Sequence, residues 1–101
     1  MKTIIGVVGP GNATPDQLRW AEKIGAHVAE AGHVLLTGGM DGVMRSSSKG
    51  AKRAGGLVIG VSSGDSRTGL NSFVDIPILT GIGAARNYVN VLTSTAVIAI
   101  G

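Results

Sequence analysis

Short apolar segments recur along this chain, and most of them end at or next to a glycine. Each is rich in Val, Ile and Leu, a pattern typical of strands buried on both faces of a parallel sheet. Only three residues are aromatic, so the core is expected to be aliphatic. The segments that we predict as strands are residues 3–9, 33–37, 57–61, 73–79 and 96–100.

Helical periodicity lies between these strands. The clearest case follows Thr14 and Pro15, which suit the N-cap and the first helical position. Gln17 completes a capping box with Thr14, and apolar residues then recur every three or four positions. Ser46, Ser47 and Ser48 are expected to help cap the second helix. The predicted helices are residues 15–31, 42–54 and 84–94.

Strands that alternate with helices imply crossover connections and parallel pairing. We therefore predict an α/β fold, a three-layer Rossmann-like parallel sheet of about five strands, which ends with the last strand. With 101 residues the chain is long enough for a single domain spanning residues 1–101, either a complete domain or an incomplete one. Pro77 lacks a backbone N–H, so the strand 73–79 is expected at an edge.

The composition narrows the class of protein. There is no cysteine, so disulfides and thiolate metal sites are excluded. No apolar stretch reaches the roughly 18 residues of a membrane span, and the N-terminal apolar run is too short for a signal peptide. We expect a cytoplasmic protein. His27 and His33 do not share a metal-binding spacing, so no metal site is predicted.

Four basic residues, Arg45, Lys49, Lys52 and Arg53, cluster in the second predicted helix of a chain with net charge +3. They form either a surface that attracts phosphates or nucleic acid, or a solvated helix face. No aromatic side chains lie between these basic residues to stack on bases, so nucleic-acid binding is the weaker interpretation.

Two glycine-rich turns follow the first two strands. In open α/β sheets ligands bind at the carboxyl ends of the strands, and a helix N-terminus there attracts phosphate. The spacing matches neither the dinucleotide fingerprint nor a Walker A loop, and a tight turn without a ligand is the alternative. Met44 either lines the site or packs beneath the turn. The predicted ligand-binding residues of these turns are Gly9, Gly11, Gly38, Gly39, Gly42 and Met44.

Arg86 and Asn87 begin the third predicted helix. A guanidinium can form bidentate hydrogen bonds with a phosphate group, so Arg86 and Asn87 are predicted to bind phosphate. The alternative is that Arg86 bonds to the backbone or to solvent. Arg86 is also the one candidate for a catalytic residue, and a weak one.

Several motifs resemble the LOG-like superfamily, formerly called lysine decarboxylase-like, and its small bacterial uncharacterised branch. The resemblance covers essentially the whole chain. The motifs that carry it are GGMDGVM (38–44), GAKRAGG (50–56), VIGV (58–61), TGIGAARN (80–87) and STAVIAIG (94–101).

The resemblance implies a nucleotide-binding fold whose enzymes hydrolyse the N-glycosidic bond of nucleoside monophosphates. It implies an arginine matching Arg86 and a PGGxGTxxE motif after the last strand, whose glutamate takes part in hydrolysis. This sequence ends at Gly101, before that motif. Asp41 is the only acidic residue expected near the ligand, where a turn-stabilising role is the alternative. We therefore predict binding of a phosphorylated, AMP-like nucleotide without hydrolase activity and without a required cofactor.

Two other functions stay open from the resemblance. The chain is either the N-terminal part of a LOG-type phosphoribohydrolase or a protein similar to molybdenum-cofactor carriers, since molybdopterin also bears a phosphate. If the strand order follows the superfamily, strand 96–100 lies beside strand 3–9 without an outer neighbour. An unpaired apolar edge invites strand addition, so a homodimer or higher oligomer is expected.

Overall fold

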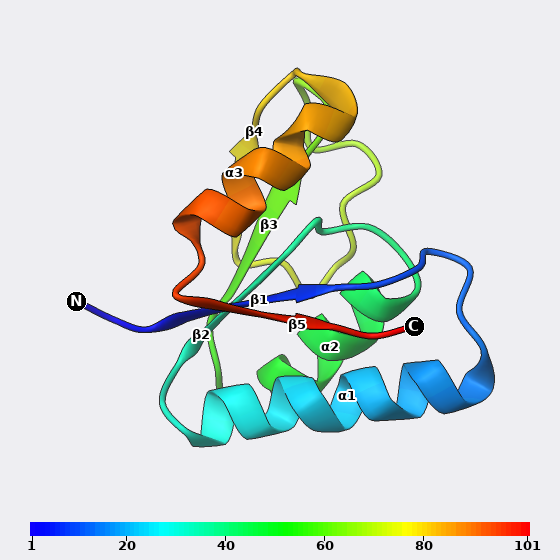
Figure 1. Cartoon of the computed structure of the whole chain (residues 1–101), viewed down its shortest axis with the longest axis vertical. Coiled ribbons are helices and arrows are strands. Elements are labelled where there is room, and N and C mark those ends of the chain that lie inside the picture. The colour runs from blue at the N-terminus through cyan, green and yellow to red at the C-terminus, as the bar shows by residue number, and fades with distance from the viewer.

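The computed structural model describes residues 1–101 and has one five-stranded sheet in which every pair of neighbouring strands is parallel (Figure 1). The strand order is β4-β3-β2-β1-β5. The predicted Rossmann-like α/β fold is confirmed, and so are the edge position of the Pro77 strand and the pairing of the last strand with the first. The strands are β1 (Ile4–Val8), β2 (Val34–Thr37), β3 (Val58–Ser62), β4 (Ile76–Leu79) and β5 (Ala96–Ala99).

Three helices complete the layers: α1 (Pro15–Glu30), α2 (Val43–Arg53) and α3 (Arg86–Thr93). In Figure 1, α1 and α2 lie on one side of the sheet and α3 on the other. Aliphatic residues of α1, α2 and the inner strands form the core between sheet and helices, as the near-absence of aromatic residues predicted. That core cluster is Val7, Ala21, Val28, Leu35, Val43, Ala51, Val58 and Ile100.

Helix α1 begins with the predicted capping box. The Thr14 hydroxyl accepts the Gln17 N–H at 3.2 Å, and the Gln17 side chain accepts the Thr14 N–H at 2.9 Å. These two bonds satisfy N–H groups that a helix start leaves without partners. The helix ends at Glu30, one residue earlier than predicted.

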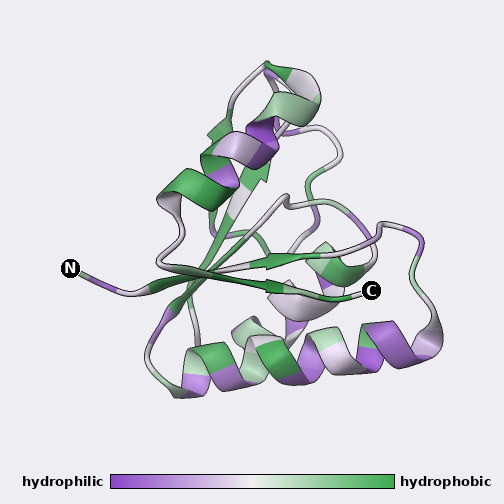
Figure 2. Cartoon of the chain, in the orientation of Figure 1, coloured by the Kyte–Doolittle hydropathy of each residue, from purple (hydrophilic) through white to green (hydrophobic).

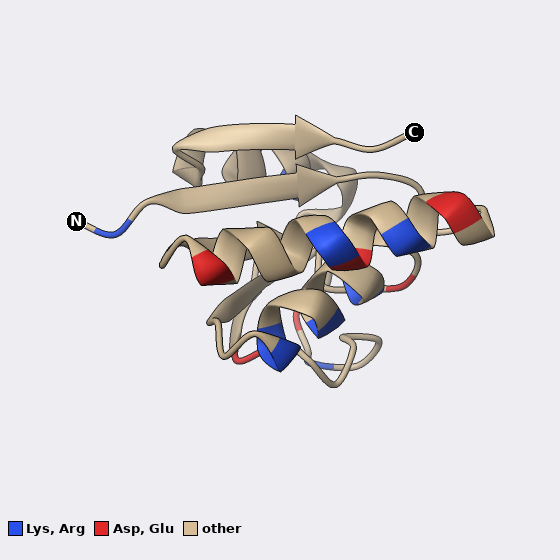
Figure 3. Ribbon diagram, turned by 90° about the horizontal axis from the view of Figure 1, so that it is seen from below, with Lys and Arg blue, Asp and Glu red and all other residues tan.

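Helices α1 and α2 pack backbone to backbone at two glycines. A Cβ on Gly25 would collide with the Ser47 carbonyl of α2, and a Cβ on Gly50 would collide with the Glu22 carbonyl of α1. The close approach places the start of α2 against the sheet. Figure 3 shows that the charged residues gather on these two helices, whereas β1 and β5 carry almost none.

Three further sequence predictions differ from the structure. Ser47 and Ser48 lie inside α2 instead of capping it, and their buried hydroxyls donate to the Val43 and Met44 carbonyls of the preceding turn. The fourth strand starts at Ile76, because the Asn71 side chain accepts the Phe73 N–H and holds that part of the chain in a turn. The third helix starts as a short 3-10 turn, Gly83–Ala85, and becomes α-helical at Arg86.

The β5 side of the molecule exposes apolar side chains. All four residues of β5 are exposed, and its outer edge has no partner strand. On α3, Tyr88 and Leu92 are each 71% exposed. Figure 2 shows hydrophobic colour on β5 and on the adjoining part of α3. None of the helices is long and apolar enough to cross a bilayer.

Candidate functional site

A cavity of about 510 Å³ lies where β1 and β2 end, beside the first turn of α2 and against α3. This is the end of the sheet at which open α/β folds bind ligands. It also lies at the topological switch point, because β2, β3 and β4 follow on one side of β1 and β5 lies on the other. The cavity contains six of the eight residues predicted as ligand-binding. Its lining is Val7, Val8, Gly9, Gly11, Gly38, Met44, Arg86, Asn87 and Asn90.

Arg86 anchors α3 to the ends of two strands. Its Nη1 donates to the Gly38 carbonyl at 2.7 Å and to the Val61 carbonyl at 2.6 Å, and its Nε donates to Asn87 Oδ1 at 3.0 Å. A guanidinium has five N–H donors, so these bonds leave the two on Nη2. The alternative that Arg86 bonds to the backbone is therefore correct, and it is compatible with anion binding through Nη2.

Burial also shapes the charge of this arginine. Desolvation lowers the pKa of Arg86, and no carboxylate lies among the residues that line the cavity. The cation therefore has no acidic partner within the site, and its nearest acceptors are neutral oxygens. A half-buried guanidinium in this state favours an anion, because charge-assisted hydrogen bonds are about twice as strong as neutral ones.

Gly38 makes room for this arginine. A Cβ at position 38 would come within 2.6 Å of both the Arg86 Cζ and the Met44 Sδ. Met44 itself is half-buried and lines the cavity. The glycine that ends β2 is thus needed for the position of Arg86, independently of any ligand.

Gly39 and Gly42 are the two predicted residues that do not line the cavity. Both have positive φ, +78° and +66°, which an L side chain rarely adopts. They shape the turn that leads into α2. The Val43 N–H donates to the Pro10 carbonyl at 3.1 Å, and this hydrogen bond connects the second glycine turn to the first. The Met44 N–H, also in the first turn of α2, has no carbonyl partner in the protein.

The sequence prediction missed three residues of the cavity: the apolar Val7 and Val8 and the polar Asn90. The Asn90 side chain is 3% exposed, and its Oδ1 has no hydrogen-bond partner. An unsatisfied buried polar atom costs about 1–3 kcal/mol, so such atoms are rare. Asn90 follows Arg86 by four residues, which is the helical spacing that places two side chains on one face. That spacing was the available signal, but polar residues in helices usually face solvent.

The other charged candidates lie away from the cavity. Asp41 is exposed in the second glycine turn. In the basic cluster, Lys52 pairs with Asp75 at 2.9 Å, Arg53 pairs with Glu22 at 2.9 Å, and the Arg45 guanidinium lies 5.1 Å from the centre of the Phe73 ring. Much of the predicted basic surface is therefore engaged with other parts of the protein. No three His, Cys, Asp or Glu side chains are grouped to hold a metal ion.

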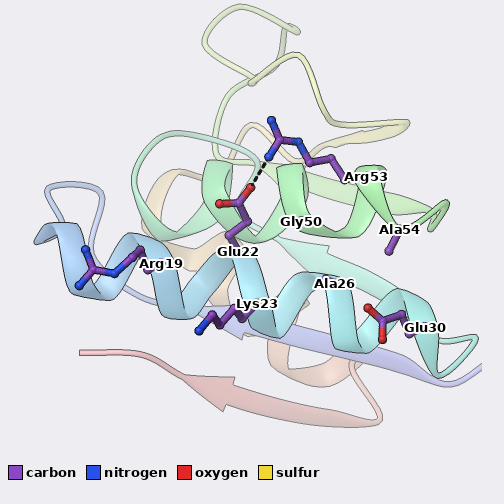
Figure 4. A pocket seen from close by; sticks show the side chains of 8 residues that line it. All are labelled: Arg19, Glu22, Lys23, Ala26, Glu30, Gly50, Arg53 and Ala54. Carbon is purple, nitrogen blue, oxygen red and sulfur yellow. Dashed lines mark hydrogen bonds and ion pairs between the residues drawn. The ribbon is translucent and has the colours of Figure 1, made fainter.

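A second hollow of about 500 Å³ lies between α1 and α2 (Figure 4). Its rim carries Arg19, Lys23 and Arg53, but Arg53 points toward Glu22 and Arg19 pairs with Asp16. It is a surface groove along two helices, distant from the glycine turns. The cavity at the strand ends is therefore the candidate site.

Comparisons with known proteins agree with this fold. The molybdenum cofactor binding protein of Rippkaea orientalis is 50% identical with a TM-score of 0.98, and the match covers 100% of this chain and 63% of that one. The molybdenum cofactor carrier protein of Chlamydomonas reinhardtii is 47% identical with a TM-score of 0.90, covering 99% and 63%. An uncharacterised protein of Archaeoglobus fulgidus is 44% identical over 97 residues, covering 96% and 64%.

The chain thus spans a little under two thirds of the length of these relatives. The model of the SLOG cluster4 family, which is related to the LOG-like proteins, matches residues 2–101. Together with the fold, this match means that the chain belongs to the SLOG cluster4 family.

Proposed function

We propose that the chain binds a phosphorylated pterin, the molybdenum cofactor, in the cavity between β1, β2 and α3, and acts as a carrier of it. The observation that carries the proposal is the pairing of a half-buried cation with a buried amide in one cavity. Arg86 has two N–H groups left for a phosphate, and the Asn90 amide oxygen is without a partner.

The residues of the cavity fit such a cargo. Its volume, about 510 Å³, lies within the range of roughly 300–1,000 Å³ that is usual for small-molecule sites. Arg86 and the free backbone N–H of Met44 supply donors for a phosphate, and the side-chain amide of Asn90 supplies hydrogen-bonding groups for the ring. Two relatives described as binding or carrying molybdenum cofactor share 47–50% of the sequence, which supports the same ligand class here. The metal would belong to the cargo.

A nucleotide such as AMP is the second candidate, because it also joins a phosphate to a nitrogen heterocycle. The comparisons favour the cofactor over the nucleotide, which reverses the order of preference that the sequence motifs indicate. For either ligand we propose binding without hydrolysis by these 101 residues. An assay of base release from AMP checks this part, and we expect no release above the uncatalysed rate.

The test is co-purification from a host that synthesises the cofactor. The purified protein is denatured, its pterin is oxidised, and the fluorescent product is counted per protein chain. We expect a substantial fraction of wild-type chains to carry pterin and Arg86→Gln chains to carry much less. Equal pterin in the two proteins, or none in either with tight AMP binding in calorimetry, would overturn the cofactor assignment.

We also propose that two copies of the chain associate through β5. The outer edge of this strand has no partner strand, and Val97 and Ile98 on it are exposed. An apolar edge of this kind pairs readily with a second strand. A homodimer or larger assembly would cover it.

A further inference from the structure

We infer that the side-chain amide of Asn90 recognises the heterocycle of the ligand by hydrogen bonding, while Arg86 holds the phosphate of the same molecule. This inference rests on the proposed function and extends it, because it says that Arg86 contacts the phosphate of the ligand and Asn90 contacts the heterocycle. The ligand class is an amino-substituted nitrogen heterocycle joined to a phosphate.

The first observation is the state of the side chain. Asn90 is 97% buried, and its Oδ1 is the only buried side-chain nitrogen or oxygen without a partner in the structure. Nearly all buried polar atoms in native proteins are bonded, so an exception that lines a cavity points to a partner from outside. A side-chain amide in this position suits a ring that carries both hydrogen-bond donors and acceptors, as pterin and adenine rings do.

The fold does not need this side chain. The main-chain carbonyl of Asn90 accepts the Ser94 hydroxyl at 2.7 Å and the Ser94 N–H at 3.1 Å, and these bonds end α3. On the Asn90 side they use only the main-chain carbonyl, so they persist with another side chain at position 90. The Asn90 amide oxygen has no hydrogen-bond partner in the protein, so it does not stabilise the folded state without ligand.

The spacing along α3 fixes the direction of the ligand. Arg86 and Asn90 both line the cavity, and residues four apart on a helix have Cβ atoms roughly 5–6 Å apart. A phosphate held by Arg86 therefore leaves the ring one helical turn further along α3. Val7 and Val8 of β1 line the same cavity and offer the ring an apolar surface.

The experiment compares two probes that share a phosphate. Ribose 5-phosphate has no heterocycle, and neopterin 3′-phosphate carries a pterin. Affinities are measured by calorimetry for the wild type and for Asn90→Leu, which has nearly the same size. We expect Asn90→Leu to bind the pterin probe at least about tenfold more weakly and ribose 5-phosphate unchanged. Its melting temperature without ligand should rise, because a buried unpaired amide is removed.

Two further variants make the result decisive. Asn90→Ala gives the same comparison with a smaller side chain, and Asn12→Leu changes an exposed asparagine outside the cavity lining and should bind both probes as the wild type does. Equal affinity of wild type and Asn90→Leu for the pterin probe would overturn the inference and leave the proposed function intact. Parallel loss of both probes would also overturn it, since Asn90 would then serve only to position α3. If the wild type binds neither probe, the proposed function itself fails.

Discussion

Arg86 combines two roles that are usually separate. Its Nη1 ties the carbonyls of Gly38 and Val61 to α3, and its Nη2 is left for a ligand. One side chain thus fixes the geometry of the cavity and supplies its charge. A lysine at this position would keep the charge but lose the separate Nη2 donors that Arg86 has left for a ligand.

We predict that Arg86→Gln binds inorganic phosphate at least about tenfold more weakly. We also expect it to lower the free energy of unfolding by roughly 1–3 kcal/mol, because two buried carbonyls lose charged donors. Calorimetry and urea unfolding measure the two effects. Arg67→Gln is the matched control, since Arg67 is exposed and outside the cavity. Unchanged phosphate affinity in Arg86→Gln would contradict the assignment of the anion site.

The charge of Arg86 also sets a pH dependence. Burial lowers the pKa of Arg86, but an arginine stays protonated throughout the physiological range. A phosphate monoester gains its second negative charge near pH 6. We therefore predict that the affinity for ribose 5-phosphate rises between about pH 5 and 7 and then levels off. Calorimetry across this range checks it, and a falling affinity would show that another group dominates.

At the scale of elements, the site depends on how closely α1 and α2 approach. Glycine in a helix interior ordinarily costs up to about 1 kcal/mol relative to alanine, so a Gly→Ala change usually stabilises a helix. At Gly50 the added Cβ would collide with the Glu22 carbonyl of α1. The packing of the helices therefore outweighs helix propensity at this position.

We predict that Gly50→Ala destabilises the protein by roughly 1–3 kcal/mol, the usual cost of overpacking. It should also weaken phosphate binding, because α2 carries Met44 into the cavity. Urea unfolding and calorimetry give both values. Gly64→Ala is the control: Gly64 lies in a loop, and its added Cβ meets no atom closer than 3.8 Å. A stabilised Gly50→Ala protein would mean that the helices separate without cost.

At the scale of the whole molecule, the two edges of the sheet differ in their surroundings. β4 carries Pro77, which cannot donate a backbone hydrogen bond, whereas β5 has no such residue. The exposed apolar residues of α3 lie next to β5 and enlarge the surface that association would cover (Figure 2). We therefore expect association through β5 and not through β4.

Sedimentation or light scattering over a range of concentrations tests this. The wild type should form dimers or larger species, and Val97→Lys on β5 should shift them toward monomers, because lysine on an edge strand opposes strand addition. Ile76→Lys on β4 is the matched control and should associate as the wild type does. A wild type that stays monomeric at every concentration would refute the proposal, and dissociation by Ile76→Lys alone would assign the contact to β4.

Much of the fold follows from local sequence patterns. The capping box at Thr14 and the apolar runs predict α1 and the strands, because caps and burial patterns depend on residues close in sequence. Local patterns do not define a boundary where a residue distant in sequence decides it. Asp75 accepts the Val58 N–H at 2.8 Å, and Asn71 bonds to the Gly39 and Met40 carbonyls, so the start of β4 depends on contacts with other elements.

By itself the sequence determined the parallel α/β fold, the position of the glycine turns at the strand ends, and Arg86 as the candidate anion-binding side chain. The tertiary structure alone decided which of these residues meet. It separated Gly39 and Gly42, which shape a turn, from Gly38, which accommodates Arg86, and it brought Asn90 into the cavity. The physical reason is that an unpaired buried atom is a property of packing: a sequence shows that Asn90 is polar, but only the folded chain removes water from it and supplies no partner.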